Sequence, residues 1–148
     1  MKKPPVVKPI DILIVEDSPT DVMLMREALY HTKVLNTLHA VDDGVEAMDF
    51  LHRRGKYSEE SRPDLILLDL NMPRKNGQEV LAEIKGSEGL RSIPVIILTT
   101  SRADADVASA YGGHANCYIA KPVDYDAFVE VARSIQNFWF TIVTLPPV

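Results

Sequence analysis

The 148-residue sequence contains almost no cysteine and no long apolar run. The single Cys117 excludes a disulfide within the chain and is typical of a reducing compartment. No apolar run approaches the roughly 20 residues that a membrane-spanning helix needs. Lys2 and Lys3 are not followed by the apolar segment and cleavage site of a signal peptide. We therefore expect a cytoplasmic protein that does not contact a membrane.

Basic side chains are also in the minority. The chain has 16 Lys and Arg against 21 Asp and Glu, which gives a formal net charge of −5. Such a chain is repelled by phosphate backbones, so we expect no nucleic-acid partner. The four histidines lack the spacing of metal ligands. With 46% hydrophobic and 25% charged residues, the composition is that of one ordinary globular domain.

The sequence does contain a regular alternation of apolar runs and helical patterns. The runs predict strands at 10–15, 34–41, 64–69, 93–101 and 115–122. The patterns predict a first helix that begins after Ser18. Four more helices are predicted within 42–54, 77–85, 102–114 and 124–138. The polar stretch 55–63 is predicted to be a solvated loop. Five strands alternating with five helices indicate an α/β protein with a parallel sheet covered on both faces.

Polar side chains lie at the carboxyl ends of four of the predicted strands: Glu16 and Asp17, Asp69, Thr99 and Lys121. In such folds ligands bind beyond the carboxyl ends of the strands. Three carboxylates with one lysine leave an excess of negative charge, which Mg²⁺ would relieve. Asp69 could then act as an oxygen nucleophile toward a phosphoryl donor, while Thr99 and Lys121 bind the phosphate oxygens. The set predicts a phosphoryl-transfer site.

Each of these residues has a simpler explanation when it is taken alone. Asp69 could be a solvated turn residue, and the acids at 16–17 could offset the dipole of the next helix. Thr99 could reflect strand propensity, and Tyr118, which lies three residues before Lys121, could be a half-buried packing residue. The ordered set, with a polar group at each of these strand ends, favours a functional site.

Two other protein classes share parts of this pattern. A haloacid-dehalogenase-type phosphatase also uses an aspartate after an apolar strand, but it needs a second acid where this chain has Asn71. A flavodoxin-like FMN-binding protein needs a Ser-, Thr- or Gly-rich loop after the first strand. The acidic segment EDSPT would repel its phosphate.

Over residues 8–138 the sequence resembles the receiver domain of two-component response regulators. The resemblance depends on Glu16-Asp17, LLDLNMP with Asp69, Gly77, ILTTS with Thr99, and YIAKP with Tyr118 and Lys121. It implies a flavodoxin-like (βα)5 fold, a doubly wound parallel sheet with strand order 2-1-3-4-5. Such a protein is a signalling switch and not an enzyme, apart from Mg²⁺-dependent self-phosphorylation and autodephosphorylation.

The resemblance also implies a role for each site residue. Asp69 would be the phosphoacceptor, with a sensor histidine kinase as donor. The Asp17 and Asp69 side chains and the backbone carbonyl of Asn71 would bind Mg²⁺, with Glu16 acting through a metal-bound water.

Three further roles concern the response to phosphorylation. Thr99 would move to the phosphoryl group, Tyr118 would change rotamer with it, and Lys121 would pair with the phosphate. The Lys121–Pro122 peptide bond would be cis. A receiver fold kept only as an interaction module, without phosphotransfer, is the alternative function.

Within this family, the segment from Ala40 to Gly77 resembles single-domain regulators that pair with bacterial, especially cyanobacterial, phytochromes. The insert FLHRRGKY, at 50–57, carries this resemblance. It implies that the upstream kinase is a red/far-red photoreceptor.

The last ten residues, 139–148, form an apolar tail, and we expect no output domain after it. The tail could fold back on its own core or bind the kinase. We favour a homodimer formed through the last helix and this tail, because aromatic residues are enriched in interface cores.

Overall fold

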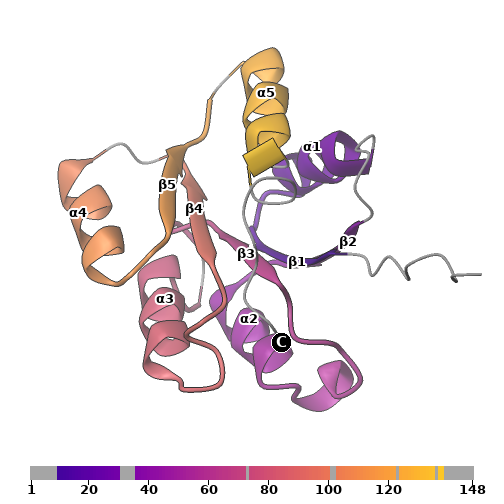
Figure 1. The fold of residues 1–148 in the computed structure, drawn as a ribbon, viewed down its shortest axis with the longest axis vertical. Coiled ribbons are helices and arrows are strands. Elements are labelled where there is room, and N and C mark those ends of the chain that lie inside the picture. The colour runs from indigo at the N-terminus through magenta and orange to yellow at the C-terminus, as the bar shows by residue number, and fades with distance from the viewer. Residues whose placement is uncertain are drawn as a thin grey trace, which may run out of the picture.

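The computed structural model describes residues 10–30, 36–72, 74–100, 103–122, 124–135 and 137–138. Strands and helices alternate along the chain (Figure 1). They are β1 (Ile10–Val15), α1 (Pro19–Tyr30), β2 (Asn36–Val41), α2 (Gly44–Leu51), β3 (Leu65–Leu68), α3 (Gly77–Gly86), β4 (Val95–Thr99), α4 (Asp104–Gly112), β5 (Cys117–Ala120) and α5 (Tyr125–Ile135). A short 3₁₀ helix, η1 (Gly55–Tyr57), lies between α2 and β3.

The strands form one parallel sheet in the order β2-β1-β3-β4-β5. This confirms the predicted α/β class and the strand order 2-1-3-4-5. The last residue of β1, Val15, lies beside Val41 of β2 and Leu68 of β3, so these strands end at the same level. The chain changes direction across the sheet between β1 and β3, which is where ligands bind in folds of this type.

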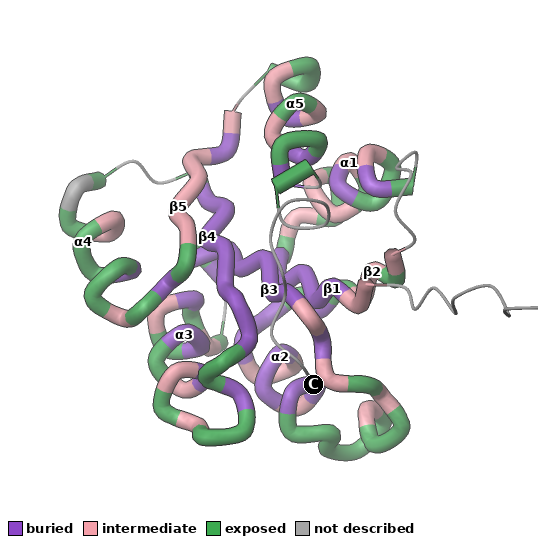
Figure 2. Tube along the Cα trace, in the orientation of Figure 1, coloured by how far each residue is buried: buried purple, intermediate pink, exposed green. Residues whose placement is uncertain are grey.

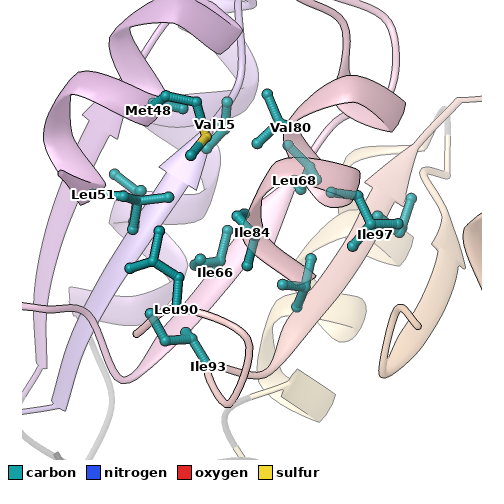
Figure 3. Packing of buried hydrophobic residues seen from close by; sticks show 14 of the residues in the cluster. Val15, Met48, Leu51, Ile66, Leu68, Val80, Ile84, Leu90, Ile93 and Ile97 are labelled. Carbon is teal, nitrogen blue, oxygen red and sulfur yellow. The ribbon is translucent and has the colours of Figure 1, made fainter. Parts of the chain in front are cut away.

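The central strands are buried because helices cover both faces of the sheet. Every residue of β3 and β4 is buried, and Figure 2 shows both strands in purple through the middle of the molecule. Alternate residues of a strand point to opposite faces. Ile66 and Leu68 pack with α2 and α3 in one core (Figure 3), while Leu65 and Leu67 pack with α1 and α5 in the other.

Local capping fixes where the helices begin. Ser18 Oγ accepts a hydrogen bond from the Asp21 N–H at 3.3 Å, and Pro19 is the first residue of α1, as predicted. Asp43 caps α2, and Asn76 forms a capping box with Glu79 at the start of α3. These caps hold the loops that follow the strands.

The segment 55–63 is not wholly a loop, because η1 forms within it. The Tyr57 hydroxyl donates to Glu46, and its ring lies 5.3 Å from that of Phe50, between ring centroids. These contacts join η1 to α2. They stabilise a turn of helix that the polar composition of residues 55–63 does not predict.

Two other expectations have different outcomes. There is no cis peptide bond among the described residues, so the expectation of a cis Lys121–Pro122 bond was wrong. The trans form is favoured by about 0.5–1 kcal/mol in X–Pro bonds. The apolar tail, 139–148, lies outside the described residues.

None of the helices in the described part of the chain has the length and apolar character required to cross a membrane.

Candidate functional site

The carboxyl ends of four strands meet at one edge of the sheet. Backbone hydrogen bonds align them: the Asp69 N–H donates to Val15 O at 3.0 Å, and the Lys121 N–H to Thr99 O at 2.6 Å. The side chains of Glu16, Asp69, Thr99 and Lys121 are therefore brought together. Each of these residues is at most 7% exposed, so they form a buried polar cluster within a largely apolar core.

The Lys121 ammonium lies at the centre of this cluster. It donates to Glu16, to Asp21 Oδ2 at 2.8 Å and to Asp69 Oδ2 at 3.4 Å. An ammonium group has three N–H donors, so each donor has a carboxylate acceptor. The acceptors come from three places in the chain: the end of β1, the first turn of α1 and the end of β3.

Two acids of the cluster and the exposed Asp17 beside them could bind a metal ion. Glu16, Asp17 and Asp69 each offer one carboxylate oxygen, and these oxygens lie within 4.8 Å of one another. Glu16 Oε2 is buried and has no hydrogen-bond partner among the residues that the structure describes. A buried oxygen without a partner is costly, and a cation would satisfy it. The all-oxygen donor set fits a hard divalent cation.

Burial and neighbouring charge set the protonation of the cluster. Burial, followed by the adjacent Asp69, raises the pKa of Glu16 to about 9. For Asp69, burial acts to raise the pKa, but hydrogen bonds from Glu16, Asn71 and Thr99 and the Lys121 charge outweigh it and lower the pKa. For Lys121, burial is outweighed by the surrounding carboxylates, which raise its pKa. Asp69 is thus kept ionised, which is the state that an oxygen nucleophile requires.

Asn71 and Thr99 connect the loop after β3 to the end of β4. The Asn71 N–H donates to Asp69 Oδ1 at 3.1 Å, and Asn71 Nδ2 donates to Thr99 Oγ1 at 3.4 Å. Thr99 is fully buried, whereas Thr100 is exposed. The geometry therefore places Thr99, and not its neighbour, in the cluster.

Two glycines allow the loop after β3 to pack closely. A Cβ at Gly77 would lie 2.3 Å from the backbone oxygen of Asp69, and one at Gly44 would lie 2.1 Å from that of Lys75. Arg74, in the same loop, pairs with the buried Asp43 at 3.1 Å. The loop is held against the start of α2, which fixes the backbone beside Asp69.

Tyr118 lies outside the polar cluster. It is partly buried on β5, packs against the core that contains α2 and α3, and donates its backbone N–H to the Tyr111 hydroxyl at 3.2 Å. The structure thus brings together six of the seven predicted site residues and places the seventh on the neighbouring surface of β5 and α4.

Sequence reasoning missed Asp21. The available signal was an acid in the first turn of the predicted helix, four positions after Asp17. The contact with Lys121 spans 100 positions in the sequence, and no local pattern reveals it.

The profile of the response regulator receiver domain family matches residues 12–133 of the chain. The response regulator Rcp1 of Synechocystis is 45% identical over 135 residues, which cover 91% of this chain and 92% of Rcp1. The comparison supports the resemblance over nearly the full length of both proteins.

Two solved structures have the same fold. The phosphorylated cyanobacterial phytochrome response regulator RcpA superposes with a TM-score of 0.92 at 44% identity, covering 95% of this chain and 100% of RcpA. The Mn²⁺-bound form of Rcp1 gives a TM-score of 0.91 at 45% identity, covering 94% of this chain and 100% of Rcp1.

Proposed function

The chain belongs to the response regulator receiver domain family, and we propose that Asp69 is the residue through which it is switched, by accepting a phosphoryl group from a sensor histidine kinase in the cytoplasm. One observation carries this assignment. Asp69 is a buried carboxylate whose pKa is lowered, with Lys121 Nζ 3.4 Å from one oxygen and the Asn71 N–H 3.1 Å from the other. Such a group is ionised, oriented and adjacent to a cation that can bind the incoming phosphate.

The metal that accompanies the reaction is proposed to be Mg²⁺. Asp17, Asp69 and the backbone carbonyl of Asn71 would hold it, with Glu16 acting through a water. The compact set of carboxylate oxygens and the unpartnered Glu16 Oε2 support this proposal, as does the Mn²⁺-bound structure of Rcp1. When bound, the ion would offset the excess negative charge and polarise the phosphoryl oxygens.

The proposed transfer forms one bond and breaks one. An Asp69 carboxylate oxygen attacks phosphorus, the bond from phosphorus to the donor histidine nitrogen breaks, and the leaving imidazole takes up a proton from solvent. The product is an acyl phosphate on Asp69. The Lys121 ammonium and the Thr99 hydroxyl stabilise the phosphoryl oxygens, and autodephosphorylation is the attack of water on the same phosphorus.

The switch is proposed to be read out on the surface made by α4, β5 and α5. Thr99 lies at the end of β4 beside this surface, and Tyr118 lies on β5 within it. Movement of Thr99 to the phosphoryl group would vacate space that the Tyr118 ring can enter. A change from nearly off to nearly on needs about 5.5 kcal/mol, which a few charge-assisted hydrogen bonds and one ring movement can supply.

The upstream kinase is proposed to be a phytochrome-type photoreceptor. The likeness to Rcp1 and to RcpA, which is a cyanobacterial phytochrome response regulator, supports this. The insert at 50–57 adds an ordered surface, because η1 is fixed by the Tyr57 contacts with Phe50 and Glu46.

We also propose that residues 8–138 act as one receiver domain, and that two copies associate through α5 and the tail that follows it.

Intact mass after incubation with Mg²⁺ and acetyl phosphate tests the central proposal. We expect one added phosphoryl group in the wild type, none in Asp69→Asn, and none when a chelator removes Mg²⁺. Asp126→Asn, which changes an exposed acid of α5, is the matched control and should be modified as the wild type is. A folded wild type that takes up no phosphoryl group would instead favour an interaction module without phosphotransfer.

A further inference from the structure

Asp21 contacts the lysine of the site but does not belong to the group of acids that could bind a metal. Its Oδ2 lies 2.8 Å from Lys121 Nζ, closer than Asp69 Oδ2 at 3.4 Å. The acids whose oxygens lie within 4.8 Å of one another are Glu16, Asp17 and Asp69. The contact between Asp21 and Lys121 therefore needs an explanation of its own.

We propose that Asp21 is a positioning residue, which holds the Lys121 ammonium in place while the other two acceptors of that ammonium are engaged by metal and phosphate. This inference rests on the proposed function. In the structure Lys121 shares its three N–H donors among Glu16, Asp21 and Asp69. A metal ion draws on the oxygens of Glu16 and Asp69, and phosphorylation removes the negative charge of the Asp69 carboxyl itself. Of the three acceptors, only Asp21 keeps a carboxylate that neither the metal nor the phosphoryl group engages.

The fold makes Asp21 a rigid anchor. It lies in the first turn of α1, where its N–H donates to Ser18 Oγ at 3.3 Å. Met25 and Leu29 of α1 pack in the same hydrophobic core as residues of the sheet and Phe128 of α5. Because the backbone around Asp21 is fixed by a cap and by core packing, its carboxylate can set the position of a flexible lysine side chain.

The surroundings of Lys121 offer few alternatives to this contact. A small cavity of about 10 Å³ beside the ammonium is lined by Glu16, Asp21 and Asp69, and otherwise mainly by apolar side chains. Such a volume is about that of one water probe. A lysine that lost Asp21 would keep only Glu16 and Asp69 as carboxylate acceptors among the described residues, and its ammonium would be drawn toward them.

Two possible roles of Asp21 predict opposite effects of its removal on the phosphorylation rate, so an experiment can distinguish them. If Asp21 contributes only charge, its loss makes the site less negative and speeds reaction with an anionic phosphodonor. If it positions Lys121, its loss leaves the ammonium misplaced, and phosphorylation slows. Small misplacements at reacting centres cost up to about 100-fold in rate.

The test compares Asp21→Ala, Asp21→Asn and the wild type in the full chain. The readouts are the rate of Mg²⁺-dependent phosphorylation by acetyl phosphate and the affinity for beryllium fluoride, a phosphoryl mimic. We expect Asp21→Ala to lower both by about tenfold or more, with Asp21→Asn intermediate because its amide oxygen still accepts a hydrogen bond. Glu27→Ala, which removes an exposed acid from the same helix, should match the wild type.

A double-mutant cycle shows whether Asp21 acts through Lys121. In a Lys121→Met background, Asp21→Ala should change the phosphorylation rate by less than about twofold, because the group it positions is gone. A merely structural effect would persist in that background.

The outcomes separate this inference from the proposed function. If the wild type is phosphorylated and Asp21→Ala reacts equally fast or faster, the positioning role is wrong while the function stands. An undiminished effect of Asp21→Ala in the Lys121→Met background also overturns it. If the folded wild type neither accepts a phosphoryl group nor binds beryllium fluoride, the function itself fails, and the role of Asp21 fails with it.

Discussion

At the residue scale, the candidate site depends on ionisable side chains that lie close together at a largely buried edge of the sheet. Glu16, Asp17 and Asp69 carry oxygens within 4.8 Å of one another, and burial beside Asp69 raises the pKa of Glu16 to about 9, because a further negative charge there is unfavourable. Like charges at such separations oppose folding unless a cation relieves them. This edge of the sheet therefore concentrates carboxyl groups, and we expect cation binding there to be visible as added stability.

We expect Mg²⁺ to stabilise the wild type against heat, and Asp17→Asn to abolish this effect. A ligand at 100 times its dissociation constant adds about 2.7 kcal/mol, which raises the midpoint of thermal unfolding by several degrees. Without metal, Asp17→Asn should be at least as stable as the wild type, since it removes one of the repelling charges. Differential scanning calorimetry with Mg²⁺ and with a chelator measures both effects.

The matched control is Asp42→Asn, which changes an exposed acid just after β2 that lies outside the cluster of three. It should keep the full response to Mg²⁺. A wild type whose unfolding midpoint is the same with Mg²⁺ and with chelator would contradict the metal site.

At the same scale, the sequence indicated most of the site but not all of it. Glu16, Asp69, Thr99 and Lys121 could be predicted because each follows an apolar run, and parallel strands end at a common edge. Asp21 could not, because its partner lies 100 positions away and the contact depends on where the first turn of α1 lies relative to the residue that follows β5. Contacts of this kind come from tertiary packing, which has no local signal.

At the scale of the secondary-structure elements, the loops after the strands matter more than the strands themselves. The loop from Asp69 to α3 is closed by a hydrogen bond from the Gly77 N–H to Leu70 O at 3.0 Å. Gly77 is not one of the described residues with a positive φ. Its role is therefore to let the start of α3 approach the backbone of Asp69 and Leu70 closely. A side chain there would push against the backbone that carries Asp69.

We expect Gly77→Ala to destabilise the protein and to slow phosphorylation of Asp69. The new Cβ would lie 2.3 Å from Asp69 O and 2.5 Å from Leu70 Cα, both of them backbone atoms that must move. Overpacking of this kind costs about 1–3 kcal/mol. Urea unfolding measures the loss of stability, and intact mass after acetyl phosphate treatment measures the loss of rate.

Gly86→Ala is the control from the other end of the same helix, where a Cβ meets nothing within 4 Å. It should leave phosphorylation unchanged and raise stability by up to about 1 kcal/mol, because it restricts the unfolded chain. Equal behaviour of the two variants would show that the close approach at Gly77 is unimportant.

The elements also show where local sequence is a reliable guide. The strand at 10–15 and the start of α1 are as predicted, because an apolar run and a Ser-Pro cap are local signals. The helix η1 was missed because it depends on Tyr57 reaching Glu46 and Phe50 of α2. A polar composition predicts a loop unless such contacts are known.

For the molecule as a whole, two hydrophobic cores share one sheet, and several aromatic side chains outside these cores are exposed. Alternating runs were sufficient to predict the layered α/β architecture. The strand order came from the family resemblance, since the local pattern leaves several orders open. Around α5, Tyr125 is 52% exposed and Phe138, just beyond the helix, is 51% exposed. Exposed aromatic groups are typical of an interface between proteins, and the sequence after Phe138 is apolar.

We expect the full-length chain to dimerise and a chain truncated before Trp139 to associate at least tenfold more weakly. Burial of aromatic anchors dominates the free energy of most interfaces, so loss of the tail should move the equilibrium toward monomer. A dilution series in analytical ultracentrifugation measures both dissociation constants. Tyr30→Ser, which removes an exposed aromatic at the end of α1, is the control and should dimerise as the wild type does. If all three proteins are monomers at every concentration, the dimer proposal is wrong; if Tyr30→Ser alone weakens association, the interface lies on α1 instead.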